Sequence, residues 1–450
     1  MKKIITLALA LALFSCAKDE KATYTIVSGK FTGTPENKFT IRGNSFQKEI
    51  NVKEDGSFID TLYLTYNGAY EIGRQGIYLH NGKNVAFDAN AEKLEDMTFT
   101  GDLAAENNYI MSKTKLQKEV LGNDPRALYS LDEADFLEKV DDFSKKRDAL
   151  VEATTFNIGD FKEKELKSGT YYKTYLLENY PDYHAHFTKN QDFKVSETFP
   201  KTDANIDFDN AADFDFSTAY RQLASSNFDK KLQEAIDKGA DFYDVIVPNL
   251  KTVKSQNIKN SLVSIFSYAV SLSNDKMETL YKELLSISTD ENFKKDLTEK
   301  YNKLQSLVKG KPSPKFNYEN HKGNTTSLDD LKGKFVYIDV WATWCGPCIG
   351  EIPFMKEVEK KYHGKNIEFV SISIDEKKDY EKWKKFVTDK QMGGIQLYAD
   401  NAWQSPFVQD YAIDGIPRFI LIDPNGMIVS GDAPRPSDEK LIKLFTELGI

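Results

Sequence analysis

The sequence predicts a multidomain α+β protein with an N-terminal antiparallel β-sandwich-like domain, a helical middle region and a C-terminal α/β domain. Three observations support this prediction. Short alternating runs and turn dipeptides fill residues 24–101, helical periodicity fills residues 102–308, and strands alternate with helices in residues 309–450. A chain of 450 residues is long enough for two or three such domains.

The first of these regions reads as a small sandwich. Alternating runs such as Phe58–Leu64 are separated by turn dipeptides, namely Asp55-Gly56, Asn67-Gly68 and Asn81-Gly82. This rhythm suits short antiparallel strands. It contains no cluster of catalytic side chains.

The middle region shows apolar residues at helical spacing, with Phe136, Val140 and Phe143 as an example. Ser130 with Glu133 is predicted to form a capping box at the start of that helix. His184 and His186 could share a strand face and bind a metal ion, but no third ligand is evident. We therefore predict no metal site.

The Pro-rich segment 309–315 is the predicted joint before the C-terminal domain. Beyond it the sequence predicts strands at 335–341 and 367–374, a hairpin of 418–422 with 427–430, and helices at 347–362, 380–388 and 437–448. Ser437 is the predicted cap of the last helix. Strands that alternate with helices in this way predict an α/β domain.

The N-terminus reads as an export signal. Lys2 and Lys3 precede an apolar run at 4–14 that is too short to span a bilayer. A small residue then precedes Cys16, and this arrangement resembles a bacterial lipoprotein signal. We expect residues 1–15 to be a signal peptide, Cys16 to be lipidated, and residues 16–23 to be a tether; an ordinary secretion signal with an incidental cysteine is the alternative.

The charged tether, AKDEK at 17–21, resembles the surface-export signal of Bacteroidota lipoproteins, while a plain solvated tether fits equally well. We expect a lipid anchor in the outer membrane, on its periplasmic side or at the cell surface. The formal net charge is −9, and no basic patch is apparent. These features argue against nucleic acid as a partner.

The remaining cysteines, Cys345 and Cys348, are three positions apart in the pentapeptide Trp-Cys-Gly-Pro-Cys. A disulfide that closes so small a loop contributes little to stability, so the pair reads as a redox couple. Cys345 falls where a strand ends and a helix begins, and that helix end favours thiolate over thiol. Cys345 should attack a substrate disulfide, and Cys348, one turn further in, should resolve the mixed disulfide.

The two residues between the cysteines suit this chemistry. Gly346 permits close approach of a substrate, and Pro347 tolerates the first turn of a helix. Asp339 interrupts an apolar strand, so burial should raise the pKa of its carboxyl group. That pKa suits proton transfer with Cys348, although an Asp that faces solvent on the strand is the alternative.

Residues 310–450 resemble the thioredoxin superfamily, and more closely its TlpA-like extracytoplasmic branch. The resemblance rests on GKPSPKF at 310–316, VYIDVWATWCGPC at 336–348, Glu351 with Pro353, and Gly415-Ile416-Pro417. Residues 24–101 resemble the β-domain that often precedes such domains in Bacteroidota lipoproteins.

The resemblance implies further site residues. It places a buried acid at Asp339 and makes Glu351 a candidate modulator of the site, with a plain surface acid as the alternative. Ile416-Pro417 matches a loop with a cis-proline that faces the dithiol and pairs with an extended substrate. Trp344 should shield the thiols and line the substrate surface.

Together these features predict a thiol-disulfide oxidoreductase that mainly reduces protein disulfides outside the cytoplasm. Its cofactor-free redox centre would be the Cys345–Cys348 disulfide. The expected partners are disulfide-containing proteins, with apocytochromes c among the candidates, and a membrane electron donor, because cytosolic reductant does not reach an exported site.

Three other classes stay open. A thiol peroxidase is one, but a peroxidatic cysteine normally follows a proline seven positions upstream, and the positions seven before Cys345 and Cys348 are Ile338 and Trp341. A zinc module is poorly supported because two thiols fill half of a tetrahedral site. A surface or periplasmic binding lipoprotein with a secondary thioredoxin domain is the third.

Overall fold

The computed structural model describes residues 23–202 and 205–450. The predicted signal peptide, Cys16 and nearly all of the tether lie outside the described residues. The chain forms two compact units: the first contains residues up to Glu234 together with Val253–Ser261, and the second contains Ala235–Thr252 together with Leu262–Ile450. The helical region contributes to both units, and the segment 309–315 lies within the second.

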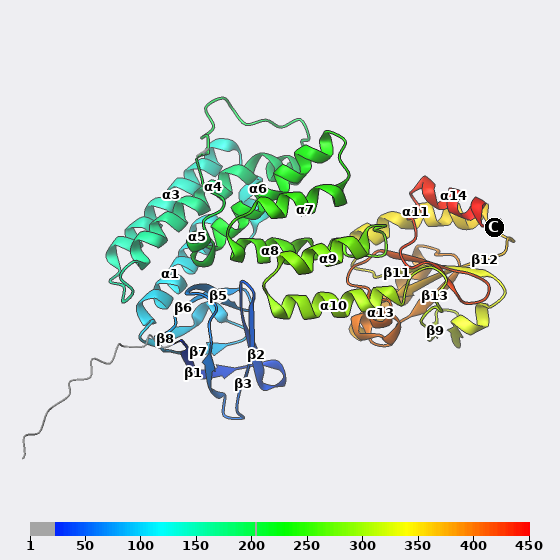
Figure 1. The fold of residues 1–450 in the computed structure, drawn as a ribbon, viewed down its shortest axis with the longest axis horizontal. Coiled ribbons are helices and arrows are strands. Elements are labelled where there is room, and N and C mark those ends of the chain that lie inside the picture. Colours follow the sequence, from blue (N-terminus) through cyan, green and yellow to red (C-terminus); the bar gives the residue numbers. More distant parts are fainter. Residues whose placement is uncertain (1–22, 203–204) are drawn as a thin grey trace, which may run out of the picture. The chain divides into compact units, whose positions relative to one another are not determined.

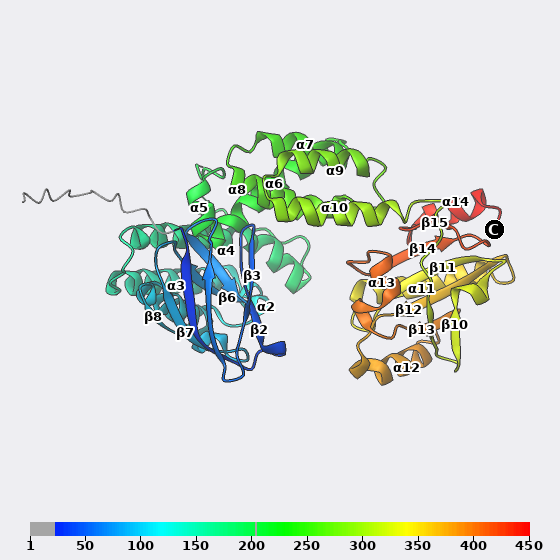
Figure 2. The ribbon, with the colours of Figure 1, turned by 60° about the horizontal axis from the view of Figure 1, so that its bottom comes forward.

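The first unit contains two four-stranded sheets, with strand orders β4-β1-β7-β8 and β3-β2-β5-β6 (Figure 2). The strands are β1 Thr25–Thr32, β2 Lys38–Gly43, β3 Phe46–Asn51, β4 Ser57–Leu62, β5 Gly68–Ile72, β6 Gln75–Leu79, β7 Val85–Asn90 and β8 Thr98–Gly101. Aromatic side chains such as Phe39, Phe58 and Phe87 pack in the core of this sandwich.

One strand pair departs from the predicted antiparallel pattern. β1 pairs with β7 in parallel, while the other pairs of these two sheets run antiparallel. Gly29 lies in this pair at a φ of +140°, and a Cβ atom there would lie 1.8 Å from the carbonyl oxygen of Phe87. The close approach of the two backbones therefore requires glycine at this position.

Helices complete the first unit (Figure 1). They are α1 Ala104–Leu121, α2 Pro125–Tyr129, α3 Glu133–Ala153, α4 Phe161–Thr188 and α5 Ala211–Phe216, with α6 Thr218–Asp237 and α8 Gln256–Phe266 extending past its sequence limits. Tyr109 of α1 and Phe161 of α4 join the sandwich core, so these helices pack directly on the strands.

Two local predictions in this region are wrong. Asp132, not Ser130, caps α3, because its side chain accepts a hydrogen bond from the amide of Asp135. His184 and His186 lie in α4, not on a strand. Residues two apart on a helix face different directions, so the two imidazoles do not form a metal-binding pair.

The second unit is built on a seven-stranded mixed sheet in the order β10-β9-β13-β12-β11-β14-β15. Its strands are β9 Asn317–Asn320, β10 Thr325–Ser327, β11 Phe335–Trp341, β12 Ile367–Ser373, β13 Ile395–Tyr398, β14 Arg418–Ile422 and β15 Ile428–Ser430. Strands β11, β12 and β13 run parallel, and β14 runs antiparallel to β11. The apolar strand β11 is therefore central in the sheet, which explains its near-complete burial.

The helices of this unit are α7 Phe242–Thr252, α9 Met277–Ile287, α10 Glu291–Gln305, α11 Gly346–Lys361, α12 Tyr380–Asp389, α13 Pro406–Asp410 and α14 Glu439–Glu447. α11 and α14 share one core with β11, in which Tyr337 packs against Phe445. The C-terminal domain therefore has the predicted thioredoxin-like alternation of strands and helices.

The described residues lack two features, a membrane-spanning helix and a metal-binding cluster. No helix within 23–202 and 205–450 is long and apolar enough to cross a membrane. The same residues hold no group of three or more His, Cys, Asp or Glu side chains arranged to bind a metal ion.

Candidate active site

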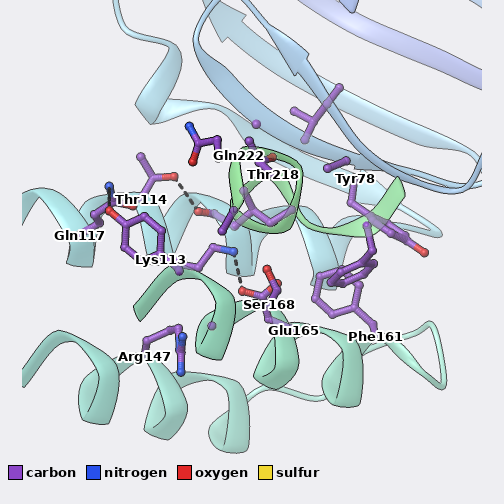
Figure 3. Close-up of a pocket in the computed structure, with 18 of the residues that line it drawn as sticks. Tyr78, Lys113, Thr114, Gln117, Arg147, Phe161, Glu165, Ser168, Thr218 and Gln222 are labelled. Carbon is purple, nitrogen blue, oxygen red and sulfur yellow. Dashed lines mark hydrogen bonds and ion pairs between the residues drawn. The ribbon is translucent and has the colours of Figure 1, made fainter. Parts of the chain in front are cut away.

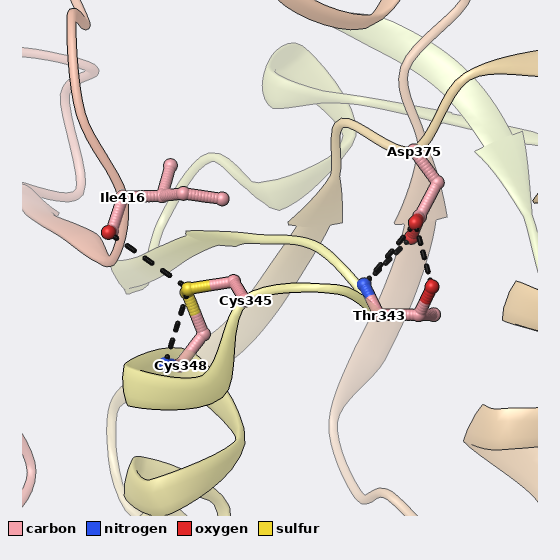
Figure 4. Close-up of a disulfide and its surroundings, with 5 residues drawn as sticks. All are labelled: Thr343, Cys345, Cys348, Asp375 and Ile416. Atoms are coloured by element: carbon pink, nitrogen blue, oxygen red, sulfur yellow. Dashed lines mark hydrogen bonds between the residues drawn. A yellow bond between two sulfur atoms is a disulfide. The ribbon is translucent and has the colours of Figure 1, made fainter. Parts of the chain in front are cut away.

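The two cysteines lie at the point where β11 gives way to α11, and they form a disulfide with a Cα–Cα distance of 5.3 Å (Figure 4). Cys345 is the N-cap of α11, and its Sγ accepts a hydrogen bond from the amide of Cys348 at 3.2 Å. Pro347 occupies the first turn, where a missing amide proton costs no helical hydrogen bond. The amide and the helix dipole stabilise negative charge on Sγ, so an opened disulfide would favour a Cys345 thiolate.

Both sulfurs are almost covered. Cys345 is 4% exposed and Cys348 2% exposed, so the two residues are covered to nearly the same extent. Trp344 is 50% exposed, and its ring lies 6.4 Å from that of Trp403. A Cβ atom at Gly346 would meet nothing within 4 Å, which leaves open space before the disulfide.

The loop before β14 faces the disulfide. The Ile416–Pro417 peptide bond is cis. The carbonyl oxygen of Ile416 lies 3.8 Å from Cys345 Sγ, although the two residues are 71 positions apart (Figure 4). The fold therefore brings the loop and the first cysteine together.

Asp339 lies in the middle of β11 and is 6% exposed, so it does not face solvent. Burial raises the pKa of Asp339 to about 8, and the negative charges of Glu351 and Glu359 add to the increase. Among the described residues, Oδ1 of Asp339 has no hydrogen-bond partner. A buried acid with this pKa can hold or release a proton near neutral pH.

Glu351 connects α11 to the segment before α14. Its carboxylate accepts hydrogen bonds from the Ser437 amide at 3.0 Å and from the Ser437 hydroxyl at 2.8 Å. The predicted role of Ser437 as helix cap is therefore wrong, because Asp438 caps α14 by accepting from the Lys440 amide. Ser437 instead fixes a charge that raises the pKa of Asp339.

Asp375 is a site residue that the sequence did not lead us to predict. Its carboxylate is fully buried and accepts hydrogen bonds from the amide and hydroxyl of Thr343 (Figure 4). It also accepts a hydrogen bond from the hydroxyl of Ser373. Thr343 lies two residues before Cys345, so this carboxylate holds the turn that carries the disulfide. Its position just after β12, at the carboxyl edge of the parallel strands, is a signal that could have identified it.

Glu359 was also missed. Burial raises the pKa of Glu359 to about 7, and the nearby Lys356 ammonium partly opposes the increase. Its carboxylate lies against a glycine pair, since a Cβ atom at Gly393 would be 2.1 Å from Oε2. Nothing in the local sequence marks it, because Gly393 is 34 residues away.

Comparison with known proteins covers this domain. Residues 308–441 match the Redoxin family. The thiol-disulfide oxidoreductase ResA of Bacillus anthracis is 31% identical over 140 residues, which is 30% of this chain and 78% of that protein. ResA of Bacillus cereus is 28% identical over 157 residues, covering 32% of this chain and 83% of that protein.

Solved structures match the same part of the chain. The thioredoxin domain of a thiol-disulfide oxidoreductase from Bacteroides vulgatus is 29% identical, with a TM-score of 0.29, and covers 32% of this chain and 99% of that one. The sequence relatives carry the assignment, because one of them exceeds 30% identity across most of its length. The chain is an enzyme that belongs to the thioredoxin-superfamily thiol-disulfide oxidoreductases.

Proposed function

We propose that this protein reduces disulfides of other proteins outside the cytoplasm, with Cys345 as the attacking residue. The observation that supports this most directly is the setting of Cys345 Sγ. It lies at the first turn of α11, 3.2 Å from the Cys348 amide, and 3.8 Å from the carbonyl oxygen of Ile416. The sulfur thus sits between a group that stabilises thiolate and a loop that can hold an extended chain.

The proposed reaction begins with the reduced dithiol. The Cys345 thiolate attacks one sulfur of a substrate disulfide, a mixed disulfide forms, and the other substrate sulfur leaves as a thiolate that takes up a proton. The Cys348 thiolate then attacks Cys345 Sγ and releases the second substrate sulfur. The substrate gains two electrons and the enzyme disulfide is restored.

Asp339 is proposed to take the Cys348 thiol proton during this second attack. Its raised pKa, about 8, makes its carboxylate a competent base close to the operating pH. No hydrogen bond joins the two side chains in the described residues, so the transfer would use a water molecule or a small movement. Glu351 would modulate the step through its negative charge.

Substrate binding is assigned to the surface around the disulfide. Trp344, Gly346 and Pro347 would form one side, and Ile416 with cis-Pro417 the other. Backbone pairing with Ile416 would orient a substrate strand without reading its sequence. This mode suits an enzyme that accepts several folded or unfolded proteins.

Each cycle consumes two electrons, so the proposal includes a donor. For an exported enzyme this is a membrane protein that passes electrons to the Cys345–Cys348 disulfide. We further propose that a lipid on Cys16 anchors the chain in the outer membrane, on its periplasmic side or at the surface. Disulfide-containing proteins, with apocytochromes c as one candidate, are the proposed substrates.

Trapping in intact cells tests this proposal. The Cys348→Ala variant should stop at the mixed disulfide, because the resolving sulfur is absent. We expect high-mass adducts on a non-reducing gel that disappear when a reductant is added. Mass spectrometry should identify the trapped partners as exported proteins. The matched control is the double variant Cys345→Ala, Cys348→Ala, which should form none. Equal adducts from both variants, or none from either, would refute the reductase mechanism.

A further inference from the structure

The first unit contains a cavity of about 320 Å³ between its sandwich and its helices, remote in sequence from the two cysteines. β6, α1, α3, α4 and α6 contribute to its wall (Figure 3). Small-molecule sites are typically ~300–1,000 Å³, so this cavity has the size for a ligand of a few heavy atoms and not for a polymer. The proposed reductase function uses none of its residues.

A buried carboxylate lies in the wall. Glu165 of α4 is 4% exposed, and its Oε1 accepts a hydrogen bond from Lys113 at 2.5 Å (Figure 3). The same oxygen accepts a hydrogen bond from the Tyr109 hydroxyl at 3.1 Å. No described residue donates to its second oxygen, Oε2. Glu165 therefore retains an acceptor atom that a ligand donor could use.

The buried guanidinium of Arg147 also lies in the cavity wall. Arg147 of α3 is 4% exposed; its Nε and Nη2 bind Asp148, while Nη1 has no acceptor within the described part of the chain. Nη1 lies against Gly169 of α4, where a Cβ atom would be 1.5 Å away. Glycine at this position leaves room for the guanidinium at the cavity wall.

A buried donor without an acceptor costs free energy, about 1–3 kcal/mol and more for a charged group. Native proteins rarely retain one unless a water molecule or a ligand pairs with it. Here the orphaned donor of Arg147 and the unused acceptor of Glu165 line the same cavity. Nη1 of Arg147 lies beside Gly169, which is one helical turn after Glu165 on α4, about 6 Å along the helix axis between the two Cα atoms.

The charged groups at the cavity are neutral only when an ion-pair partner outside it is included. Lys113, Arg147 and Glu165 line the cavity, and Asp148, which does not line it, pairs with Arg147. With both ion pairs made, a ligand with a net charge would leave an unpaired charge in a buried site. A ligand that carries both an anionic and a cationic group keeps the balance.

Aromatic side chains form part of the remaining wall, beside small, aliphatic and neutral polar residues. Tyr78, Phe143, Phe161, Tyr172 and Phe216 line the cavity. Aromatic faces contribute buried apolar area and accommodate a planar or aliphatic side chain. The ligand should therefore have an apolar portion beside its two charged groups.

We propose that this cavity binds a small zwitterion of the α-amino acid class with an apolar side chain. Its carboxylate accepts from Nη1 of Arg147, its ammonium group donates to Oε2 of Glu165, and its side chain packs on the aromatic wall. The site would make the first unit a ligand-binding module of the enzyme.

Calorimetry on the purified full chain tests the proposal with three related probes: L-phenylalanine, N-acetyl-L-phenylalanine, which lacks the ammonium group, and 2-phenylethylamine, which lacks the carboxylate. We expect L-phenylalanine to bind at millimolar concentration or below and each analogue to bind at least about tenfold more weakly, because each loses one charged hydrogen bond. No heat from L-phenylalanine, or equal affinity for either analogue, overturns the proposal without any variant.

Variants then locate the site. Arg147→Lys and Glu165→Gln should each weaken L-phenylalanine binding about tenfold or more. Glu163→Gln is the matched control, because Glu163 is exposed on the same helix and does not line the cavity. Binding that is unchanged in both cavity variants, or lost equally in the control, refutes this location.

Discussion

At the scale of single residues, the site depends on carboxyl groups that are buried for different reasons. Asp375 accepts hydrogen bonds from Thr343 and Ser373, so its carboxylate holds the turn before Cys345. Asp339 has an unpaired Oδ1, and burial raises its pKa. One acid positions the disulfide, and the other is suited to exchanging protons.

The raised pKa of Asp339 predicts how stability varies with pH. An ordinary Asp loses its proton near pH 3.8, whereas folded Asp339 keeps it to about pH 8. The contribution of this proton to the free energy of unfolding is therefore largest below pH 3.8, and it is lost as the pH rises through 8. The Asp339→Asn variant does not have this pH-dependent loss of stability. Its free energy of unfolding, relative to that of the wild type, should therefore increase by up to about 1.4 kcal/mol per pH unit across this range.

Urea unfolding of the oxidised protein at several pH values measures this difference. Tryptophan fluorescence is a suitable probe, because all four tryptophans lie in the C-terminal domain. Asp389→Asn is the matched control, since it is the same substitution at an Asp that is exposed at the end of α12. A pH-independent difference for Asp339→Asn would show that Asp339 ionises normally.

At the scale of elements, α11 combines several tasks. Its first turn holds the disulfide, Glu351 binds the segment before α14, and Glu359 lies against the chain at Gly393. A single helix therefore links the redox centre to two distant segments of the sheet region. Substitutions on either carboxylate should alter the pKa of Asp339 because both charges act on it.

The strand pair β1–β7 predicts a contrast between two glycines of the sandwich. Gly29→Ala places a methyl group 1.8 Å from a backbone oxygen at a φ that L-residues rarely adopt, so it should cost at least about 3 kcal/mol. Gly76→Ala, in strand β6, meets nothing within 4 Å and should change stability by less than about 1 kcal/mol.

Thermal unfolding followed by far-ultraviolet circular dichroism compares the two variants. The sandwich lacks tryptophan, so this signal is more informative there than fluorescence. Similar melting temperatures for the two variants would contradict the close approach of β1 and β7.

At the scale of the whole molecule, two compact units carry separate chemistry. The disulfide and its supporting acids lie in the second unit, while the cavity with Arg147 and Glu165 lies in the first. A change at the disulfide should therefore be detected mainly by probes of the second unit.

The direction of catalysis can be examined through stability. For a reducing enzyme, the folded protein stabilises the disulfide, whereas a strong oxidant stabilises its dithiol. We expect the fluorescence transition to need more denaturant in the oxidised than in the reduced protein, while tyrosine or circular-dichroism changes from the first unit stay the same. A lower midpoint for the oxidised protein would favour an oxidase instead.

Much of the redox domain follows from local sequence. The pattern at 335–341 predicts β11 with its observed bounds, and the predicted helix at 347–362 differs from α11 by one residue at each end. These features depend on apolar runs and on proline geometry, which act over a few residues. The predicted capping roles of Ser130 and Ser437 are wrong because an Asp one or two residues further along the chain, Asp132 or Asp438, caps each helix instead.

The sequence by itself determined the family of the protein and its two redox cysteines, because a strand, a thiol pair and a helix start are contiguous. Tertiary structure decided what surrounds them. Asp375 reaches Thr343 across 32 residues, Ser437 reaches Glu351 across 86, and Arg147 meets Gly169 on another helix. Such contacts arise from the packing of strands and helices that are distant along the chain. The local periodicity of the sequence therefore does not predict which residues will be partners.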